Sequence, residues 1–302
     1  MEKERFNVIC LDAGQTSTKL FLLNEQKEII LSRGFSPILH FAKKNALSHF
    51  KTILKQIFQK IRQMSKQSDL YIVMSLSGFY TEDQEVKKQI IEYVKQINNR
   101  IKNVEVFPDT YAHWYVANRG APSILVINGG GSVVFGKNGN DEIKIDGWGH
   151  ALGDEGSSFW IGLQAIKLYL YDKATNRTNT EIRDKIETTF SISSEYEMLT
   201  RYYSGKVTDQ HISNIAKEII QLAYRGDKEA KEIVNQSIQL LTNNVSKALK
   251  TIGKLPVFLS GGVFQSDYYY EQFVRILDHK DTRRLIYDEE HFVKKLFDLA
   301  LP

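Results

Sequence analysis

One arrangement of strands and turns occurs twice in this 302-residue chain, and it constrains the fold more than any other feature. Each copy consists of a strand, a turn that contains glycine, a second strand, a polar turn and a third strand. The expected strands are 6–11, 18–23 and 28–33 in the first copy and 123–128, 133–136 and 142–145 in the second. The copies begin about 117 residues apart, at Phe6 and Ser123. Unless the repeat is coincidental, it predicts a chain with two related α/β halves.

The segments around these copies alternate between helical and strand patterns. We expect helices near 47–64, 155–171, 208–225, 227–252 and 288–300, a further helix opened by a possible capping box of Thr81 and Gln84, and further strands at 70–76, 104–107 and 256–260. This order predicts two mixed α/β domains, 1–118 and 119–302, with a ligand cleft between them. It leaves open whether the last helix returns to the N-terminal domain.

Composition narrows the class of protein. The net charge of +4 comes from 40 basic and 36 acidic residues, with no dense basic block, so nucleic acid is not expected as a partner. The single cysteine, Cys10, lies in an apolar run and is expected to be a buried thiol. The sequence shows no signal peptide and no 18-residue apolar stretch, so we expect a cytoplasmic protein without a membrane partner.

The segment Asp146–Ser157, with the sequence DGWGHALGDEGS, has the residue types that bind a sugar. Its glycines allow sharp turns and close approach of a ligand, Trp148 offers an apolar ring face, and Asp154 and Glu155 can accept bonds from hydroxyls. The segment leads into a helix, whose N-terminus favours negative groups. The alternative is a structural one, in which a glycine-rich turn ends in an acidic helix cap.

Other turns suit phosphate chemistry. Asp12-x-Gly14-x-Thr16-x-Thr18-Lys19 places an acid at a strand end, followed by glycine and hydroxyls, and Gly129–Ser132 repeats the arrangement. Backbone N–H groups of such turns can hold phosphate oxygens, and a nearby acid can hold Mg²⁺ through water. Tight hairpins favour the same residues for structural reasons, however. Asp109 follows a strand and precedes a helix, so it is either a helix N-cap or a catalytic group at the ligand edge of a sheet.

Taken together, these segments resemble the actin/Hsp70/sugar-kinase superfamily, and within it the N-acetylglucosamine kinase-like branch (BadF/BadG/BcrA/BcrD ATPase family). Asp12–Lys19 resembles the first phosphate loop, Gly129–Ser132 the second, and Pro256–Val263 the adenosine motif. Gly147–Ser157 resembles the segment peculiar to the amino-sugar kinases and is the most specific match. The resemblance covers nearly the whole chain and implies two RNase H-like (actin-like ATPase) domains.

The resemblance also implies a function: ATP-dependent phosphorylation of a sugar hydroxyl, which in the family is the 6-hydroxyl of N-acetylglucosamine. Asp109 matches the catalytic base and a sugar contact, and Asp12 matches the position that holds Mg²⁺ through water. The implied nucleotide contacts are Gly14, Gln15, Thr16, Thr18, Lys19, Gly129, Gly130, Gly261 and Gly262. The implied sugar contacts are Gly131, Ser132, Gly147, Trp148, Gly149, Asp154 and Glu155. A homodimer is the family expectation.

Three departures from the family pattern bear on the substrates. Gly130 replaces a threonine whose hydroxyl contacts the nucleotide phosphates, Gln15 replaces a glycine, and the segment 34–40 lacks an asparagine that binds the sugar. N-acetylmuramic acid and a broader range of hexoses therefore remain alternative substrates, and a non-catalytic sugar or nucleotide sensor is an alternative function. One related group, the activators of 2-hydroxyacyl-CoA dehydratases, is rejected because it needs cysteines for an iron–sulfur cluster. The repressor/ORF/kinase group is disfavoured because its cysteine-rich zinc motif is absent.

Overall fold

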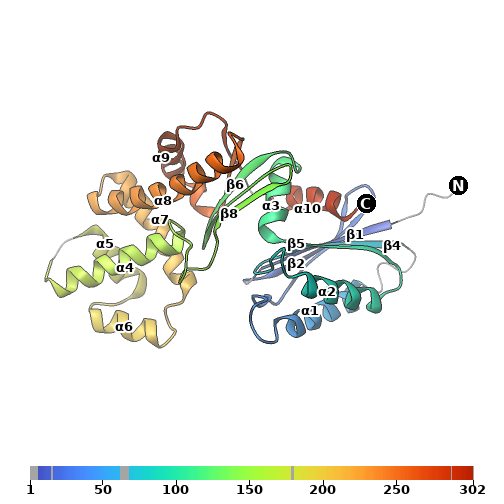
Figure 1. Ribbon diagram of the computed structural model, residues 1–302. Coiled ribbons are helices and arrows are strands. Elements are labelled where there is room, and N and C mark those ends of the chain that lie inside the picture. Colours follow the sequence, from blue (N-terminus) through green and yellow to red (C-terminus); the bar gives the residue numbers. More distant parts are fainter. Residues whose placement is uncertain (1–5, 15, 62–67, 178–179, 287, 302) are drawn as a thin grey trace. The chain divides into compact units, whose positions relative to one another are not determined.

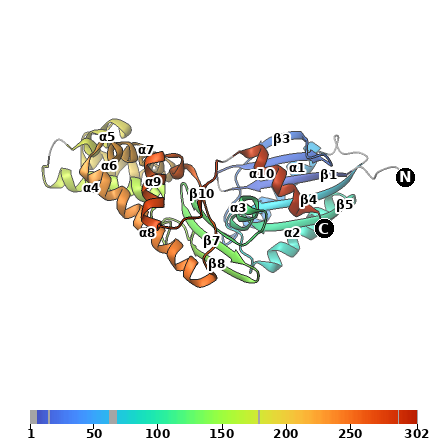
Figure 2. The same ribbon diagram turned by 90° about the horizontal axis from the view of Figure 1, so that it is seen from above.

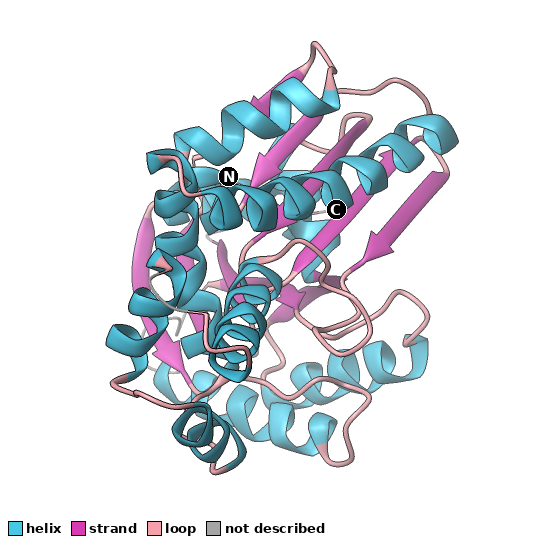
Figure 3. Cartoon of the chain, turned by 90° about the vertical axis from the view of Figure 1, so that its left-hand side faces the viewer, coloured by secondary structure: helices cyan, strands magenta, loops and turns pink. Residues whose placement is uncertain are grey.

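The computed structural model describes residues 6–14, 16–61, 68–177, 180–286 and 288–301. The chain divides into two compact units, the first comprising Met1–Gly120 and Asp288–Pro302 and the second Ala121–Tyr287. Each unit contains a five-stranded mixed sheet flanked by helices (Figure 3). No helix within the described ranges is both long and apolar enough to cross a membrane.

The first unit is a sheet with helices on both faces. Its elements are β1 (Phe6–Ala13), β2 (Thr18–Asn24), β3 (Ile29–Phe35), α1 (Ala46–Ile61), β4 (Asp69–Leu76), α2 (Gln84–Ile97), β5 (Ile101–Pro108), α3 (Asp109–Asn118), α10 (Glu289–Leu296) and the 3₁₀ turn η2 (Phe297–Ala300). The strand order is β3-β2-β1-β4-β5, with β1, β4 and β5 parallel. Helices α1 and α2 lie on one face and α3 and α10 on the other (Figure 1).

The alternation of side chains along β1 explains this layering, because successive residues of a strand point to opposite faces. Ile9 and Leu11 pack in the core that α1 and α2 cover, whereas Val8 and Cys10 pack beneath α10 and η2. Cys10 is fully buried, as expected from its apolar surroundings, and burial raises the pKa of its thiol. Helix α10 lies over β1 and β4 (Figure 2), so the C-terminal helix completes the first unit.

The second unit repeats the strand arrangement. Its elements are β6 (Ser123–Asn128), β7 (Ser132–Asn138), β8 (Asp141–Asp146), α4 (Ser158–Ala174), α5 (Glu181–Phe190), α6 (Glu195–Tyr203), α7 (Asp209–Arg225), α8 (Lys228–Ile252), β9 (Val257–Ser260), the 3₁₀ turn η1 (Gly262–Gln265), α9 (Asp267–Leu277) and β10 (Thr282–Arg284). Read from β8, the order β8-β7-β6-β9-β10 matches β3-β2-β1-β4-β5 of the first unit. The expected α/β class with two mixed sheets is therefore confirmed.

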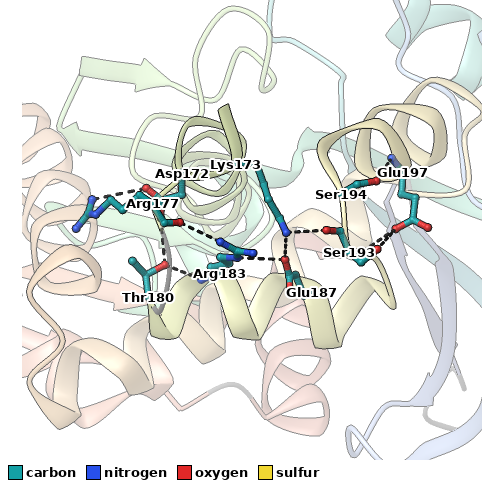
Figure 4. Close-up of polar contacts among 9 residues, drawn as sticks. All are labelled: Asp172, Lys173, Arg177, Thr180, Arg183, Glu187, Ser193, Ser194 and Glu197. Atoms are coloured by element: carbon teal, nitrogen blue, oxygen red, sulfur yellow. Dashed lines mark hydrogen bonds and ion pairs between the residues drawn. The ribbon is translucent and has the colours of Figure 1, made fainter. Parts of the chain in front are cut away.

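The helices α5 and α6 were not expected from the sequence, and polar contacts hold them to α4 (Figure 4). The buried carboxylate of Asp172 on α4 accepts a hydrogen bond of 3.1 Å from the Thr180 hydroxyl. Lys173 pairs with Glu187 on α5 and donates to the Ser193 carbonyl, at 2.6 Å, just before α6. Helix α5 does carry an apolar pattern that was overlooked, because Ile182, Ile186 and Phe190 fall at helical spacing and are buried, whereas α6 buries one side chain, Met198, and offers little apolar pattern.

A glycine sets the contact between α4 and α7. A Cβ at Gly162 would lie 2.0 Å from the Ile212 carbonyl oxygen, and that atom belongs to backbone that cannot easily move. The two helices therefore approach as closely as they do only because position 162 has no side chain.

We expect Gly162→Ala to destabilise the protein by about 1–3 kcal/mol, the usual cost of forcing extra volume into a packed interior. The measurement is the midpoint of urea denaturation. Gly130→Ala is the matched control in the same unit, because its methyl group would enter open space. Equal midpoints for the two variants would contradict the proposed close contact.

Candidate active site

In the first unit, polar groups gather where the parallel strands β1, β4 and β5 end. Asp12 and Ser75 are register partners on β1 and β4, and the Ser75 hydroxyl donates to Asp12 Oδ1 at 3.0 Å. Asp109 follows β5 directly as the first residue of α3. The carboxyl ends of parallel strands are where α/β sheets bind ligands, so this edge is a candidate site.

The Asp109 carboxylate is held by its neighbours. The Thr110 N–H donates to its Oδ1 at 2.7 Å, and the Ser77 hydroxyl donates to it from the end of β4. Burial raises the pKa of Asp109, with a smaller contribution from the negative charge of Asp12, while His113 and these hydrogen bonds act in the opposite direction. An acid with a raised pKa at a strand end suits a proton acceptor. Pro108 occupies the N-cap position, so capping does not account for Asp109.

The turn between β1 and β2 presents some of its expected contacts and buries another. The Gly14 N–H donates to the Ser17 carbonyl at 2.8 Å, which closes the turn, and Thr16 is exposed. Lys19 forms an ion pair with Glu289 of α10. Thr18 is fully buried on the opposite face of β2 from Lys19, so we do not retain it as a nucleotide contact. Gln15 lies outside the described residues.

In the second unit, the loop Asp146–Ser157 is organised by the carboxylate of Asp146, which is 3 % exposed. Its Oδ1 accepts the Gly147 N–H at 2.8 Å and the Asp154 N–H at 2.6 Å, and its Oδ2 accepts the Glu155 N–H at 3.0 Å. A Cβ at Gly153 would lie 2.2 Å from Oδ1, so glycine is required there for the loop to close over the carboxylate. Charge-assisted bonds of this kind are stronger than neutral ones.

Asp154 is fixed above the second glycine turn. Ser132 N–H donates to its Oδ1 at 3.3 Å, and Gly149 N–H also donates to its carboxylate. A Cβ at Gly131 would lie 2.7 Å from Asp154 Oδ2, so the absence of a side chain lets the acid sit there. Burial raises the pKa of Asp154, and the nearby Asp146 adds to this effect. An ionised carboxylate has about four acceptor sites, so it can still bind a ligand hydroxyl.

Some of the other expected sugar contacts are exposed, whereas Ser132 holds the loop in place. Trp148 is 56 % exposed and its ring lies over Gly153. The Ser132 hydroxyl, which we expected to contact a substrate, donates to the Glu155 carbonyl at 2.8 Å and so holds the loop. The Glu155 side chain is exposed. Gly147 and Gly149 both have positive φ, a conformation that favours glycine.

A pocket of about 910 Å³ lies beside this loop, within the second unit. Its lining brings together the second glycine turn, the adenosine-like motif and one face of α7. The lining residues are Gly129, Gly130, Ser158, Ser213, Asn214, Ala216, Lys217, Ile220, Gln221, Gly262, Val263, Gln265 and Ser266. A Cβ at Gly129, Gly130 or Gly262 would meet no atom within 4 Å, so these residues leave backbone open to a ligand. The volume and the open glycines fit a nucleotide.

Gly261 has a different role from Gly262. Its φ is +107°, and a Cβ there would lie 2.2 Å from the carbonyl oxygen of Asn128. It therefore sets the approach of β9 to β6, and only Gly262 of the expected pair lines the pocket.

Comparison with known proteins identifies the family. The model of the BadF/BadG/BcrA/BcrD ATPase family matches residues 9–290. The chain belongs to this family. It is 24 % identical over 281 residues to an N-acetylmuramic acid/N-acetylglucosamine kinase from Clostridium acetobutylicum, with 90 % of each chain covered. It is 21 % identical to an N-acetyl-D-glucosamine kinase from Dictyostelium discoideum, covering 87 % of this chain and 86 % of that one.

Solved structures share the fold of this chain. A putative N-acetylglucosamine kinase from Chromobacterium violaceum superposes with a TM-score of 0.74 at 17 % identity, covering 98 % of this chain and all of that one. The expected fold class, two actin-like ATPase domains, is thus confirmed.

Sequence reasoning missed several residues that hold the site. Asp146 was included only as the first residue of the loop, although an acid that directly follows a buried strand and precedes glycine is a recognisable turn signal. Ser77 and His113 were not considered; His113 lies one helical turn after Asp109, a spacing that places side chains together. No cluster of three metal-ligating side chains occurs among the described residues.

We expect Asp146→Ala to release the loop, because three backbone N–H groups would lose their shared acceptor. Hydrogen exchange followed by mass spectrometry should show faster exchange for the amides of Asp154 and Glu155. Asp141→Ala, an exposed change at the start of the same strand, is the control and should leave the loop protected. Unchanged protection in Asp146→Ala would contradict the assigned role.

Proposed function

We propose that the protein is an ATP-dependent kinase that phosphorylates the 6-hydroxyl of an amino sugar, most simply N-acetylglucosamine. The enzyme class is a phosphotransferase, in keeping with its kinase relatives in this family. The observation that carries the finer assignment is the loop in which Asp146 fixes Asp154 beside the exposed ring of Trp148. An acid for hydroxyls next to an aromatic face is the chemistry of a sugar site.

Asp109 is the proposed base. It accepts the proton of the attacking sugar hydroxyl, and Ser77 and the Thr110 N–H orient its carboxylate for that step. In phosphoryl transfer, positioning and electrostatics contribute more than strong base catalysis. A carboxylate fixed by two hydrogen bonds at a strand end meets that requirement.

Asp154 is the proposed sugar contact, and its free acceptor sites bind hydroxyls that position the acceptor oxygen. Gly129, Gly130 and Gly262 line the proposed nucleotide pocket, where their backbone N–H groups approach phosphate and nucleoside. Thr16 and Lys19 stay as proposed contacts from the first unit.

Asp12 is the proposed Mg²⁺ position. Its carboxylate is half-buried, and its Oδ1 accepts the hydrogen bond from the Ser75 hydroxyl. Mg²⁺ commonly keeps several waters and takes one or two carboxylates together with substrate phosphates, so one acid is sufficient protein ligation. When bound, the ion would neutralise charge on the transferred phosphoryl group.

A coupled assay of ADP release should show turnover with an N-acetylated hexosamine in a panel of N-acetylglucosamine, N-acetylmuramic acid, N-acetylmannosamine, glucosamine and glucose. Asp109→Asn should lower kcat by about 10²–10⁴-fold, the contribution of a positioned base, with sugar binding retained. Saturable sugar binding without ADP release on any sugar would favour a sensor and reject the kinase.

The pH dependence of kcat/KM should reflect the ionisation of the Asp109 carboxyl. The base must be ionised, and burial raises its pKa, so kcat/KM should fall with acid at a pH above the ordinary aspartate value of about 3.9. The positive charge of protonated His113 favours the carboxylate, and His113→Gln should therefore move this acidic limb to higher pH. An acidic limb that stays in place in His113→Gln would contradict the arrangement.

The same shift predicts a stability effect. A carboxyl whose pKa is raised in the folded protein loses stability as pH increases from its unfolded pKa through its folded pKa. Asp109→Asn removes this penalty, so its thermal midpoint should exceed that of the wild type at pH 7, and the difference should shrink toward acidic pH. If the thermal midpoint of Asp109→Asn minus that of the wild type were smaller at pH 7 than at pH 4, the assigned direction of the pKa shift would be wrong.

A further inference from the structure

Helix α7 supplies one wall of the pocket in the second unit, and its residues there are of two kinds. Ser213, Ala216 and Ile220 are buried and form the base of that wall. Asn214, Lys217 and Gln221 are exposed and follow one another at helical spacing, three and four residues apart. A stripe of polar side chains therefore runs along the wall.

Lys217 is the one charged residue among the described residues that line the pocket. Its neighbour Glu218 pairs with Lys185 of α5 at 2.8 Å, and Lys217 itself makes no ion pair with any residue that the structure describes. An unpaired ammonium group that borders a pocket without a carboxylate in its lining favours an anionic ligand.

Contacts on both sides of Lys217 hold helix α7 in the second unit. At the start of the helix, Asp209 Oδ2 lies 3.6 Å from Nδ1 of His150 in the loop Asp146–Ser157. Near its end, Tyr224 packs against Tyr268 of α9 with ring centroids 5.8 Å apart. Lys217 lies about 12 Å along the helix from Asp209 and about 10 Å from Tyr224, at 1.5 Å per residue. Lys217, Gly130 and Gly262 all line the pocket, so a ligand held by the two glycine turns shares that space with Lys217.

The second glycine turn, Gly129–Gly131, borders the same pocket as Lys217. The turn Gly129–Gly131 has no side chains, so it offers only backbone groups to a phosphate, and the space at Gly130 is open. A flexible lysine in the lining of the same pocket can supply a side-chain contact to a phosphate, because its ammonium group carries three donors on a long stem.

We propose that Lys217 binds the phosphate chain of the nucleotide and replaces the side-chain contact that the second glycine turn lacks. The proposal rests on the proposed function, since it takes the ligand of this pocket to be a nucleoside di- or triphosphate. It assigns recognition of the phosphates to α7, in addition to the glycine turns.

The test is calorimetric titration of the full chain with ADP and, separately, with adenosine. Lys217→Met keeps most of the side-chain length and removes the charge. It should weaken ADP binding about 10-fold, as expected for a charge-assisted contact, and change adenosine binding less than about twofold. Lys247→Met, an exposed lysine on α8 outside the pocket, is the control and should bind both ligands as the wild type does.

A second variant tests the link to the glycine turn. Gly130→Thr adds a hydroxyl to open space, and in the Lys217→Met background it should recover part of the lost ADP affinity. The ADP affinity of Lys217→Met should also depend less on salt concentration than that of the wild type.

The outcomes separate the two proposals. Equal weakening of ADP and adenosine in Lys217→Met would assign Lys217 to the nucleoside and overturn the inference, as would an unchanged ADP affinity. A wild-type protein that binds neither ADP nor adenosine would overturn the nucleotide pocket itself, and with it the proposed function.

Discussion

The candidate sugar site depends on the hydrogen bonds that the buried Asp146 carboxylate accepts from the backbone of its own loop. A buried anion is costly unless its oxygens are hydrogen-bonded, and here three backbone N–H groups satisfy it. Those donors belong to both ends of the loop, so one side chain closes it. The hydrogen bonds that offset the cost of burying the charge also determine the shape of the loop. Gly153 has to be glycine because a Cβ there would collide with the Asp146 carboxylate.

The closed loop is connected to the pocket through helices α4 and α7. The loop brings Asp154 over Gly131 and delivers Ser157 to the N-cap of α4, where its hydroxyl accepts the Trp160 N–H at 3.1 Å. Helix α4 in turn packs closely on α7 through Gly162, and α7 lines the pocket. The loop Asp146–Ser157 and the pocket lining are thus connected through packed helices, so a change at the α4–α7 contact can affect both.

In the first unit, two acids of the same residue type have different surroundings. Asp12 lies at the end of β1 with a single hydroxyl donor, whereas Asp109 is held at a helix start with its pKa raised by burial. The difference in environment allows one to act toward a cation and the other toward a proton. A buried carboxylate of this kind lowers the stability of the folded protein at neutral pH, a frequent cost of a functional site.

Much of the fold could be predicted, because the repeated strands carry strong apolar patterns and glycine turns at equivalent places. Helix α5 could have been found in the same way, since Ile182, Ile186 and Phe190 recur at helical spacing, whereas α6 buries one side chain, Met198, and has little apolar pattern. Their caps were a usable signal: Ser194 followed three residues later by Glu197 has the sequence of a capping box. For the site, sequence motifs indicated Asp109 and Asp154, but the buried face of Thr18 and the pocket wall on α7 depend on strand direction and packing.

Phosphoryl transfer itself is the central claim, and its most direct test is to identify the products. The protein, MgATP and N-acetylglucosamine should be incubated together and followed by ³¹P and ¹H NMR. The account predicts one N-acetylglucosamine 6-phosphate for each ADP formed, and loss of both products in Asp109→Asn. ADP accompanied only by inorganic phosphate, or a phosphate on another hydroxyl, would contradict it.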